Sequence, residues 1–310
     1  MTRHTLEAGL TTVSDVFSAD LPPVLEVDPG DVVRVHTLDC AGNLEPHSAP
    51  GVVSRVLLPE LRGHCLSGPI AVRGAAPGSA LSVRLQSLRP GTWGFTVTAG
   101  RDNVLNRRLG VAGVPMHPTL WDLDTESMRA TNELGFSVPM RPFLGVIGLA
   151  PAEPGEHSTV PPRLQGGNID CKELVAGSTL YLPVAVEGAL LSVGDGHAAQ
   201  GDGEVAGTAI ECAMTTELVV DVEPTPVLPT PYATTPAGRI TFGFDPDLNE
   251  ASAAALDAML LWMQLDLGLG RPAALTLASV AVDLRVTQVA NQVWGVHAVL
   301  PNGALRRPGG

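Results

Sequence analysis

The side chains most suited to chemistry are concentrated in the segment 190–204, which reads LLSVGDGHAAQGDGE. Asp195 and His197 stand two residues apart, so their side chains point to the same side of an extended chain. Asp202 and Glu204 repeat this spacing. Carboxylate and imidazole ligands in this arrangement suit Zn²⁺ or a similar divalent metal. The segment therefore predicts a metal or catalytic site, although acids in a glycine-rich hairpin loop also bind neighbouring N–H groups without any ligand.

A further carboxylate follows in the segment GTAIECA, where strand alternation places Glu211 on one face with Ala209 and Ala213. If this face meets water, Glu211 is an ordinary solvated acid. If it belongs to the core, Glu211 must be paired, bound to a metal or protonated, because an isolated buried charge is too costly.

A second glycine-rich turn, QGGNIDCKEL at 165–174, contains Lys172, the only lysine among the 19 basic residues. Lys172 lies two residues from Asp170, on the same side if the chain is extended. A compact ammonium with an adjustable pKa suits a catalytic role, but one lysine can also be retained by chance. Cys171 suggests a cysteine nucleophile, although the adjacent Lys172 and Glu173 would point away from it on a strand.

Composition and charge exclude several classes of function. The chain of 310 residues is 45% hydrophobic and carries a net charge of −13, which repels phosphate backbones, so we expect no nucleic-acid partner. Its start lacks the pattern of a signal peptide and no apolar run of about 18 residues occurs, so we expect no membrane partner. The four cysteines contain no C-x-x-C pair, which favours a reduced, cytoplasmic protein.

Short β-like runs between turn signals fill most of the chain up to residue 238. They predict strands at 31–39, 68–74, 79–88, 93–99 and 141–151, followed by runs within 178–186, 189–193, 205–213 and 217–222. The less regular and more polar segment 100–140 predicts long loops. Abundant glycine and proline with few aromatic residues also favour many short strands over a helical bundle.

The character of the chain changes near residue 240. After a strand at 240–244, helical spacing predicts a helix that begins after Asn249 as N-cap and ends at Gly268. The apolar segment 272–290 predicts a second helix, with Asp283 as a structural partner for Arg285 or a loop backbone, and 294–301 a final strand. The prediction is a mainly β protein with a β-sandwich at 1–238, which carries the active-site loops, and a smaller α+β subdomain at 239–310.

Several segments together resemble the acetamidase/formamidase family. They include GGNIDCKEL, SVGDGHAAQGDGE, GPIAVRGAAPGSALSVRL, PGTWGFTV, FLGVIGLAP and SVAVDLRVTQVANQVWGVHAVLP, which occur in the family's order along most of the chain. The resemblance implies a jelly-roll-like β-sandwich with an added C-terminal α+β subdomain. It also implies hydrolysis of a short primary amide, formamide or acetamide, to the carboxylate and ammonia.

The residues that match the family motifs can be assigned roles in a metal-assisted hydrolysis. Asp39, Asp170, Asp195, His197 and Glu211 are expected to hold a divalent metal, zinc first and calcium as another possibility, while Glu204, Asp202 and Lys172 are expected to be catalytic and Asn168, Gln200 and Gly167 to bind substrate. Glu204 or Asp202 would act as general base and Lys172 would stabilise the oxyanion. The chain departs from the family pattern at AGNLEPH and at GHCLSGPI, in the region expected to frame the substrate.

Two other classes of function remain open from the sequence. One is a metal-free amidase that uses Lys172 with carboxylates or with Cys171. The other is a non-enzymatic β-sandwich that binds a metal or a small ligand in the same loops. A homodimer is the expected assembly for an enzyme of this family.

Overall fold

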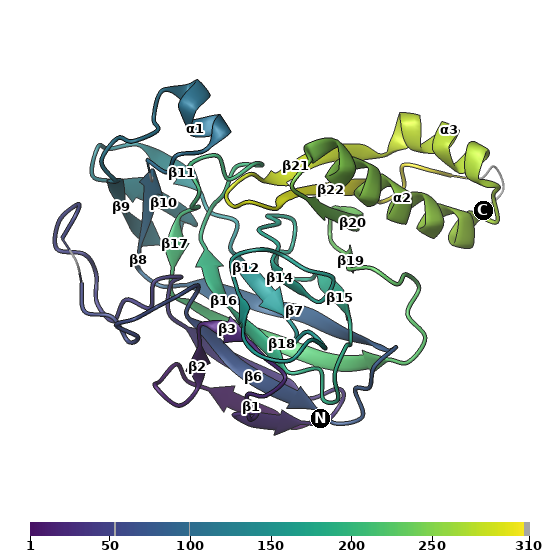
Figure 1. Ribbon diagram of the computed structural model, residues 1–310, viewed down its shortest axis with the longest axis horizontal. Coiled ribbons are helices and arrows are strands. Elements are labelled where there is room, and N and C mark those ends of the chain that lie inside the picture. The colour runs from purple at the N-terminus through teal and green to yellow at the C-terminus, as the bar shows by residue number, and fades with distance from the viewer. Residues whose placement is uncertain (53, 99, 307–310) are drawn as a thin grey trace.

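Two large β-sheets dominate the computed structural model, which describes residues 1–52, 54–98 and 100–306 (Figure 1). Among these residues, one sheet has nine strands in the order β1 (Arg3–Leu6), β5 (Val32–Thr37), β18 (Met214–Glu223), β7 (Ala80–Pro90), β15 (Thr179–Pro183), β19 (Tyr232–Thr234), β20 (Gly238–Asp245), β22 (Trp294–Pro301) and β21 (Asp283–Gln288). Its long strands β7 and β18 pair antiparallel along the whole of β18.

The second sheet has eleven described strands and carries most of the predicted site. Its main path is β11 (Ser137–Pro139), β10 (Arg129–Asn132), β9 (His117–Asp124), β8 (Trp93–Thr98), β17 (Glu211–Cys212), β16 (Leu191–His197), β12 (Phe143–Gly148) and β14 (Gly166–Asn168). Strand β6 (Leu66–Val72) joins β16 to β2 (Val13–Ser14) and β4 (Leu25–Val27), while β3 (Val16–Phe17) and β13 (His157–Ser158) form a separate pair.

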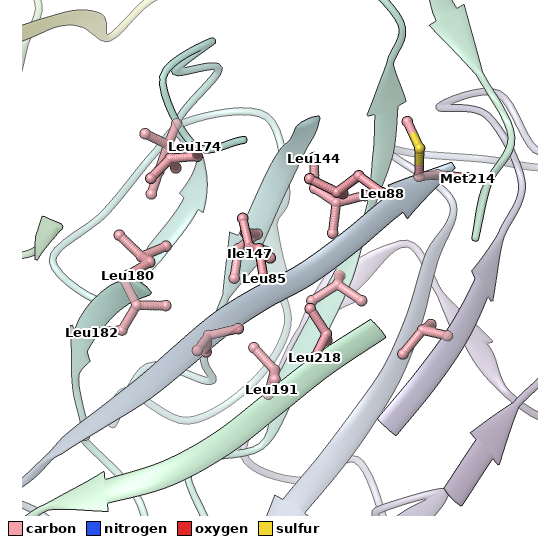
Figure 2. Close-up of a cluster of buried hydrophobic side chains, with 14 of the residues drawn as sticks. Leu85, Leu88, Leu144, Ile147, Leu174, Leu180, Leu182, Leu191, Met214 and Leu218 are labelled. Carbon is pink, nitrogen blue, oxygen red and sulfur yellow. The ribbon is translucent and has the colours of Figure 1, made fainter. Parts of the chain in front are cut away.

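One hydrophobic core lies between the two sheets. Figure 2 shows Leu85 and Leu88 of β7 and Leu218 of β18 near Leu144 of β12 and Leu191 of β16. Strands β5 and β7 of the first sheet alternate between buried apolar residues and more exposed ones, as expected for a sheet that buries one face. The prediction of a mainly β protein is confirmed. Residue 99, at the end of the predicted strand 93–99, lies outside the described residues.

The C-terminal part extends the nine-stranded sheet and adds two helices. Strand β20 begins at Gly238, at the predicted domain boundary, and pairs with β19 on one side and β22 on the other. Helix α2 (Leu248–Leu267) packs with α3 (Arg271–Ala281) against β20 and β22. Their shared apolar cluster includes Ala255 and Met259. The helices therefore have a core of their own beside the core of the sandwich.

The predicted N-cap of α2 was wrong by two residues. Asp247 is the N-cap, because its Oδ1 accepts a hydrogen bond of 2.8 Å from the backbone N–H of Asn249. The predicted end of α2 at Gly268 is confirmed. Gly268 has a φ of 64°, and its N–H donates to the carbonyl of Gln264.

Two other predictions of secondary structure were wrong. The segment 272–290 is helical only to Ala281; residues 283–288 form β21, which pairs with β22. An apolar segment has no clear period, so it fits a helix or a buried strand equally well. The predicted pairing of Asp283 with Arg285 is present, because Asp283 Oδ2 lies 3.4 Å from Arg285 Nη2. The segment 100–140 contains helix α1 (Val104–Leu109) and strands β9 to β11, whose largely exposed residues gave no apolar pattern.

No described helix is by itself long and apolar enough to cross a membrane. Helices α2 and α3 reach such a length and apolar composition only together, and this pair is bent by 110°.

Candidate active site

Strand β16 brings Asp195 and His197 into the interior of the protein. All seven residues of β16 are buried, and the strand pairs with β12 on one side and β17 on the other. The register places His197 opposite Glu211 of β17. His197 Nε2 lies 3.2 Å from Glu211 Oε2 and 3.4 Å from Asp195 Oδ2. The imidazole is therefore held between two carboxylates that come from different strands.

Asp170 and Glu204 complete the cluster from two loops. The ligand atoms of Asp170, Asp195 and His197 lie within 4.8 Å of one another, and so do those of His197, Glu204 and Glu211. Asp170, Asp195 and Glu204 have positive φ values of 54°, 58° and 43°. A non-glycine residue in this region costs about 1–3 kcal/mol and is concentrated at functional sites. The fold thus maintains strained backbone at three of the acids that face the imidazole.

Gly145 of β12 makes room for the cluster. This role was not predicted from the sequence. A Cβ at this position would lie 2.7 Å from both Asp170 Oδ1 and His197 Cε1. No real Cβ fits at such distances, so only glycine allows β12 to pass beneath the acids. The available signal was a glycine inside the apolar run FLGVIG, because glycine in a strand often marks a close approach.

The charges of the cluster are unbalanced. Burial raises the pKa of Glu204 to about 8 and that of Glu211 to about 7, and neighbouring acids add to both shifts. Burial and the charge of Glu204 also raise the pKa of Asp170 well above its ordinary value. Burial opposes protonation of His197, but Glu211 and Asp195 outweigh it and raise the pKa of the imidazole. Four carboxylates share one imidazole, so the site favours an additional cation or proton.

Many polar atoms of the cluster have no hydrogen-bond partner among the described residues. They are Asp170 Oδ1 and Oδ2, Glu204 Oε2 and His197 Nδ1, while His197 Nε2 and Glu211 Oε2 face each other at 3.2 Å without hydrogen-bond geometry. Buried polar atoms are almost always hydrogen-bonded, so such a concentration indicates a place for an ion or ordered water. One imidazole with several carboxylate oxygens suits a divalent metal such as zinc. The residues present therefore fit the predicted kind of ligand.

A cavity of about 300 Å³ opens against this cluster. Its described lining comprises Cys40, Ala41, Leu61, Arg62, Gly63, His64, Arg101, Val160, Asn168, Asp195, Glu204, Gly207, Thr208, Glu211, Ala290 and Asn291. The volume is at the small end of the range for small-molecule sites, roughly 300–1,000 Å³. The cavity is suited to a small polar molecule beside the acids.

His64 and Cys40 line the cavity but were not chosen from the sequence. His64 Nδ1 lies 2.9 Å from Thr159 Oγ1, and burial lowers the pKa of the ring although Asp195 opposes the shift. The sulfur of Cys40 lies within 4.8 Å of ligand atoms of Asp195 and Glu211. Burial and these acids raise the pKa of the thiol well above its ordinary value. His64 lies in GHCLSGPI, where the chain departs from the family pattern, and Cys40 directly precedes the other departing segment, AGNLEPH, which was the available signal.

Asp39 is buried beside the cluster but is engaged elsewhere. Its Oδ1 accepts hydrogen bonds from the backbone N–H groups of Ala41 and Asn43, and the amide of Asn43 contacts both carboxylate oxygens at 3.1 Å. Burial raises the pKa of Asp39, while Asn43 opposes the shift. Asp39 is not among the described residues that line the cavity. Its expected role as a metal ligand stays a prediction.

Lys172 pairs with Asp202 rather than with Asp170. Its Nζ lies 3.1 Å from Asp202 Oδ2, and both side chains are partly exposed. The predicted contact with Asp170 required an extended chain, but the positive φ of Asp170 turns the backbone there. The described lining of the cavity includes neither Lys172 nor Asp202. Their predicted catalytic roles therefore lack direct support from their positions.

Gln200 connects the two site loops to the C-terminal part of the chain. Its Nε2 donates to the carbonyl of Asp170 at 2.7 Å and approaches that of Thr287 at 3.5 Å. In the same loop, the N–H of Gly203 donates to the Thr287 carbonyl at 3.0 Å. The end of β21 thus fixes the loop that carries Glu204. Gln200 is absent from the described cavity lining, and its substrate role stays a prediction.

Gly167 lies on β14, whose backbone packs closely against the paired strand β12. It pairs with Ile147 of β12, and a Cβ on the adjacent Gly148 would lie 2.8 Å from the Gly167 Cα. Gly167 positions Asn168, which lines the cavity, but is not itself among the described lining residues.

Cys171 is fully buried in the sandwich core, and burial raises the pKa of its thiol to about 12. At neutral pH it is therefore not a thiolate nucleophile.

The fold and the site define a β-sandwich protein with a carboxylate-rich cluster at the wall of a small cavity. The chain belongs to the acetamidase/formamidase family, whose sequence model matches residues 4–157 and 155–227. This match confirms the resemblance found in the sequence motifs.

Individual relatives agree with this assignment. The chain is 31% identical over 239 residues to a formamidase of Methylophilus methylotrophus, across 60% of this chain and 58% of that protein. It thus matches less than two thirds of that relative's length. Its structure resembles an acetamidase from Bacillus halodurans, with a TM-score of 0.85, 27% identity and coverage of 96% and 97% of the two chains. An acetamidase from Yersinia enterocolitica gives a TM-score of 0.87 at 27% identity, with coverage of 98% and 93%.

Proposed function

We propose that the protein hydrolyses a short primary amide, formamide or acetamide, to the carboxylate and ammonia. The observation that carries the proposal is the convergence of four buried carboxylates on His197, three of which, Asp195, Glu204 and Glu211, line a cavity of about 300 Å³. The names of the relatives, formamidase and acetamidase, support the same class of substrate.

We further propose that Asp170, Asp195, His197 and Glu211 hold a divalent metal, zinc first. The support is that the donor atoms of Asp170, Asp195 and His197 lie within 4.8 Å of one another, as do those of His197, Glu204 and Glu211. Among the described residues, both carboxylate oxygens of Asp170 and Nδ1 of His197 are also buried without a hydrogen-bond partner. Bound there, such an ion would polarise the amide carbonyl and acidify water. Gly145 and the strained backbones of Asp170 and Asp195 keep the donor atoms in place for it.

Glu204 is the residue best suited to move protons. It lines the cavity, and its pKa of about 8 allows it to accept and to donate a proton near neutral pH. Glu204 would take a proton from the attacking water as the new C–O bond forms. It would then deliver this proton to the amide nitrogen as the C–N bond breaks. An unprotonated amide nitrogen is a poor leaving group, so the second transfer is required for release of ammonia.

The Lys172–Asp202 ion pair is assigned a positioning role in this proposal. Asp202 lies two residues before Glu204, and Lys172 lies two residues after Asp170. The pair therefore joins the two loops that carry these acids. This assignment replaces the expectation that Lys172 stabilises the oxyanion.

The compartment and the assembly are also proposals. The four cysteines are free, which supports a reducing cytoplasm. A homodimer stays a prediction, and sedimentation at micromolar concentration would test it.

Ammonia release from the purified protein tests the function. Formamide and acetamide should both be assayed, with propionamide and benzamide as larger amides and with Glu204→Gln as the inactive control. Metal content should be measured by elemental analysis after dialysis, and activity should be measured after chelation and after return of zinc. Full activity without metal would refute the metal proposal, and no ammonia from any amide in the presence of metal would refute the proposed reaction.

A further inference from the structure

Asn291 contributes a free hydrogen-bond donor to the cavity. It lies in the connection between β21 and β22, beyond residue 227 at which the family match ends. Its Oδ1 accepts a hydrogen bond of 2.8 Å from the N–H of Val293. This partner can only donate, so it fixes the orientation of the Asn291 amide. Nδ2 is the remaining group, and it is buried with no hydrogen-bond partner among the described residues.

Asn168 contributes a free acceptor to the same cavity. It is 5% exposed, and its Nδ2 donates to the carbonyl of Val160 at 3.0 Å. The carbonyl can only accept, so the orientation of this amide is also fixed. Oδ1 is then the remaining group, and it too is buried without a partner within the part of the chain that the structure describes. Both side chains line the cavity beside Glu204 and Glu211.

A primary amide has the complementary pair of groups, a carbonyl oxygen that accepts and an NH₂ that donates. We infer that Asn291 Nδ2 donates to the carbonyl oxygen of the substrate while Asn168 Oδ1 accepts from its NH₂. This inference rests on the proposed amide hydrolysis and adds Asn291 to the residues that contact the substrate.

The same pair explains how the product would leave. A carboxylate has no N–H for Asn168 Oδ1, so that acceptor is again unpaired after hydrolysis. The polar lining therefore distinguishes the amide from the acid that it becomes.

Two variants of Asn291 test the inference, with Asn302→Ala as a matched control. Asn302 lies in the same C-terminal part, and its Nδ2 donates to the carbonyl of Pro236, outside the described cavity lining. Asn291→Asp retains the acceptor for Val293 but loses the donor and adds a charge. Asn291→Ala loses both groups. Rates with acetamide are divided by the folded fraction from circular dichroism, so that loss of fold is not counted as loss of activity.

We expect kcat/KM to fall at least about 100-fold in Asn291→Asp, as for loss of an oxyanion donor. The fall in Asn291→Ala should be at least about 10-fold, with Asn302→Ala unchanged. An Asn291→Asp variant within about threefold of the wild type would overturn the inference while leaving the proposed function intact. A wild-type protein that releases no ammonia would overturn both.

Discussion

His197 and Glu211 face each other across adjacent strands, with the imidazole Nε2 3.2 Å from Glu211 Oε2. The other oxygen of Glu211, Oε1, accepts a hydrogen bond of 2.9 Å from the N–H of Ala209. The carboxylate is thus oriented by the backbone through Oε1 and presents Oε2 to the imidazole. Glu211 is therefore a sensitive position for testing the metal site.

Glu211→Gln retains the shape of the side chain and an acceptor for Ala209, but it removes the negative charge. We expect metal affinity to fall at least about 100-fold, because even residues that only support a ligand typically contribute 10–100-fold. Calorimetric titration with zinc measures the change in affinity. Glu217→Gln is the control, since Glu217 lies on the next strand, β18, pairs with Arg34 and is not among the described residues that line the cavity. Equal zinc affinity in the two variants would exclude Glu211 as a ligand.

Gly145→Ala should damage the site through one methyl group. The added Cβ would lie 2.7 Å from Asp170 Oδ1, so the acid or strand β12 must move. We expect a loss of stability of about 1–3 kcal/mol, typical of overpacking, together with weaker zinc binding. Thermal melting and zinc titration measure both. Gly270→Ala is the control because no heavy atom lies within 4 Å of its Cβ position. A Gly145→Ala protein with wild-type zinc binding would show that the space is not required.

The stabilising effect of zinc should increase with pH. The folded pKa values of Glu204 and Glu211 are about 8 and about 7, above the ordinary value of 4.5. The metal-free folded state thus binds protons more tightly than the unfolded state. Their contribution to stability is complete below about pH 4.5 and is lost as the pH rises through 7 and 8. Zinc binds the deprotonated acids, so protons compete with it at low pH.

Melting temperatures with zinc and with a chelator, measured at half-unit steps from pH 5.5 to 8, test this dependence. The difference between the two melting temperatures should widen steadily over the range. A constant difference would mean that the acids of the cluster do not change protonation when the metal binds.

The local features of the site could be predicted from sequence, because they depend on short spacings. The pair Asp195 and His197 lies on one strand, and the last strand, 294–301, has the predicted bounds. A single motif of fifteen residues thus located the centre of the cluster. The mainly β fold followed in the same way from alternating runs and turn residues.

Contacts between distant segments could not be predicted in this way. Gly145 and Asn291 reach the site only because β12 lies beside β16 and because β21 binds the loop at Gly203. Such pairings depend on the register of the whole sheet, which no local pattern specifies. The sequence could not show that Cys40, next to Asp39, lines the cavity, because the path of a loop decides which of two adjacent side chains faces a cavity.

Cys171→Ala should retain most of the activity. The thiol is fully buried in the sandwich core, and its pKa of about 12 keeps it protonated at neutral pH. Removing one sulfur from the core should cost about 1 kcal/mol of stability, since most point changes are of this size. Ammonia release and thermal melting measure the two effects. Complete loss of activity in a folded variant would support a covalent mechanism instead.

Lys172→Arg separates the two roles considered for the only lysine. If Lys172 stabilised the oxyanion, the broader guanidinium would fail in a small cavity and kcat would fall about 10²–10³-fold. The structure instead places Nζ 3.1 Å from Asp202, and the described cavity lining does not include it. An arginine can form the same ion pair, and a partly exposed pair contributes only about 0–1 kcal/mol. We therefore expect kcat with acetamide to stay within about threefold of the wild type. Asp202→Asn breaks the pair that joins the two loops, so it should lower kcat more than Lys172→Arg does. A 100-fold loss confined to Lys172→Arg would restore the oxyanion role.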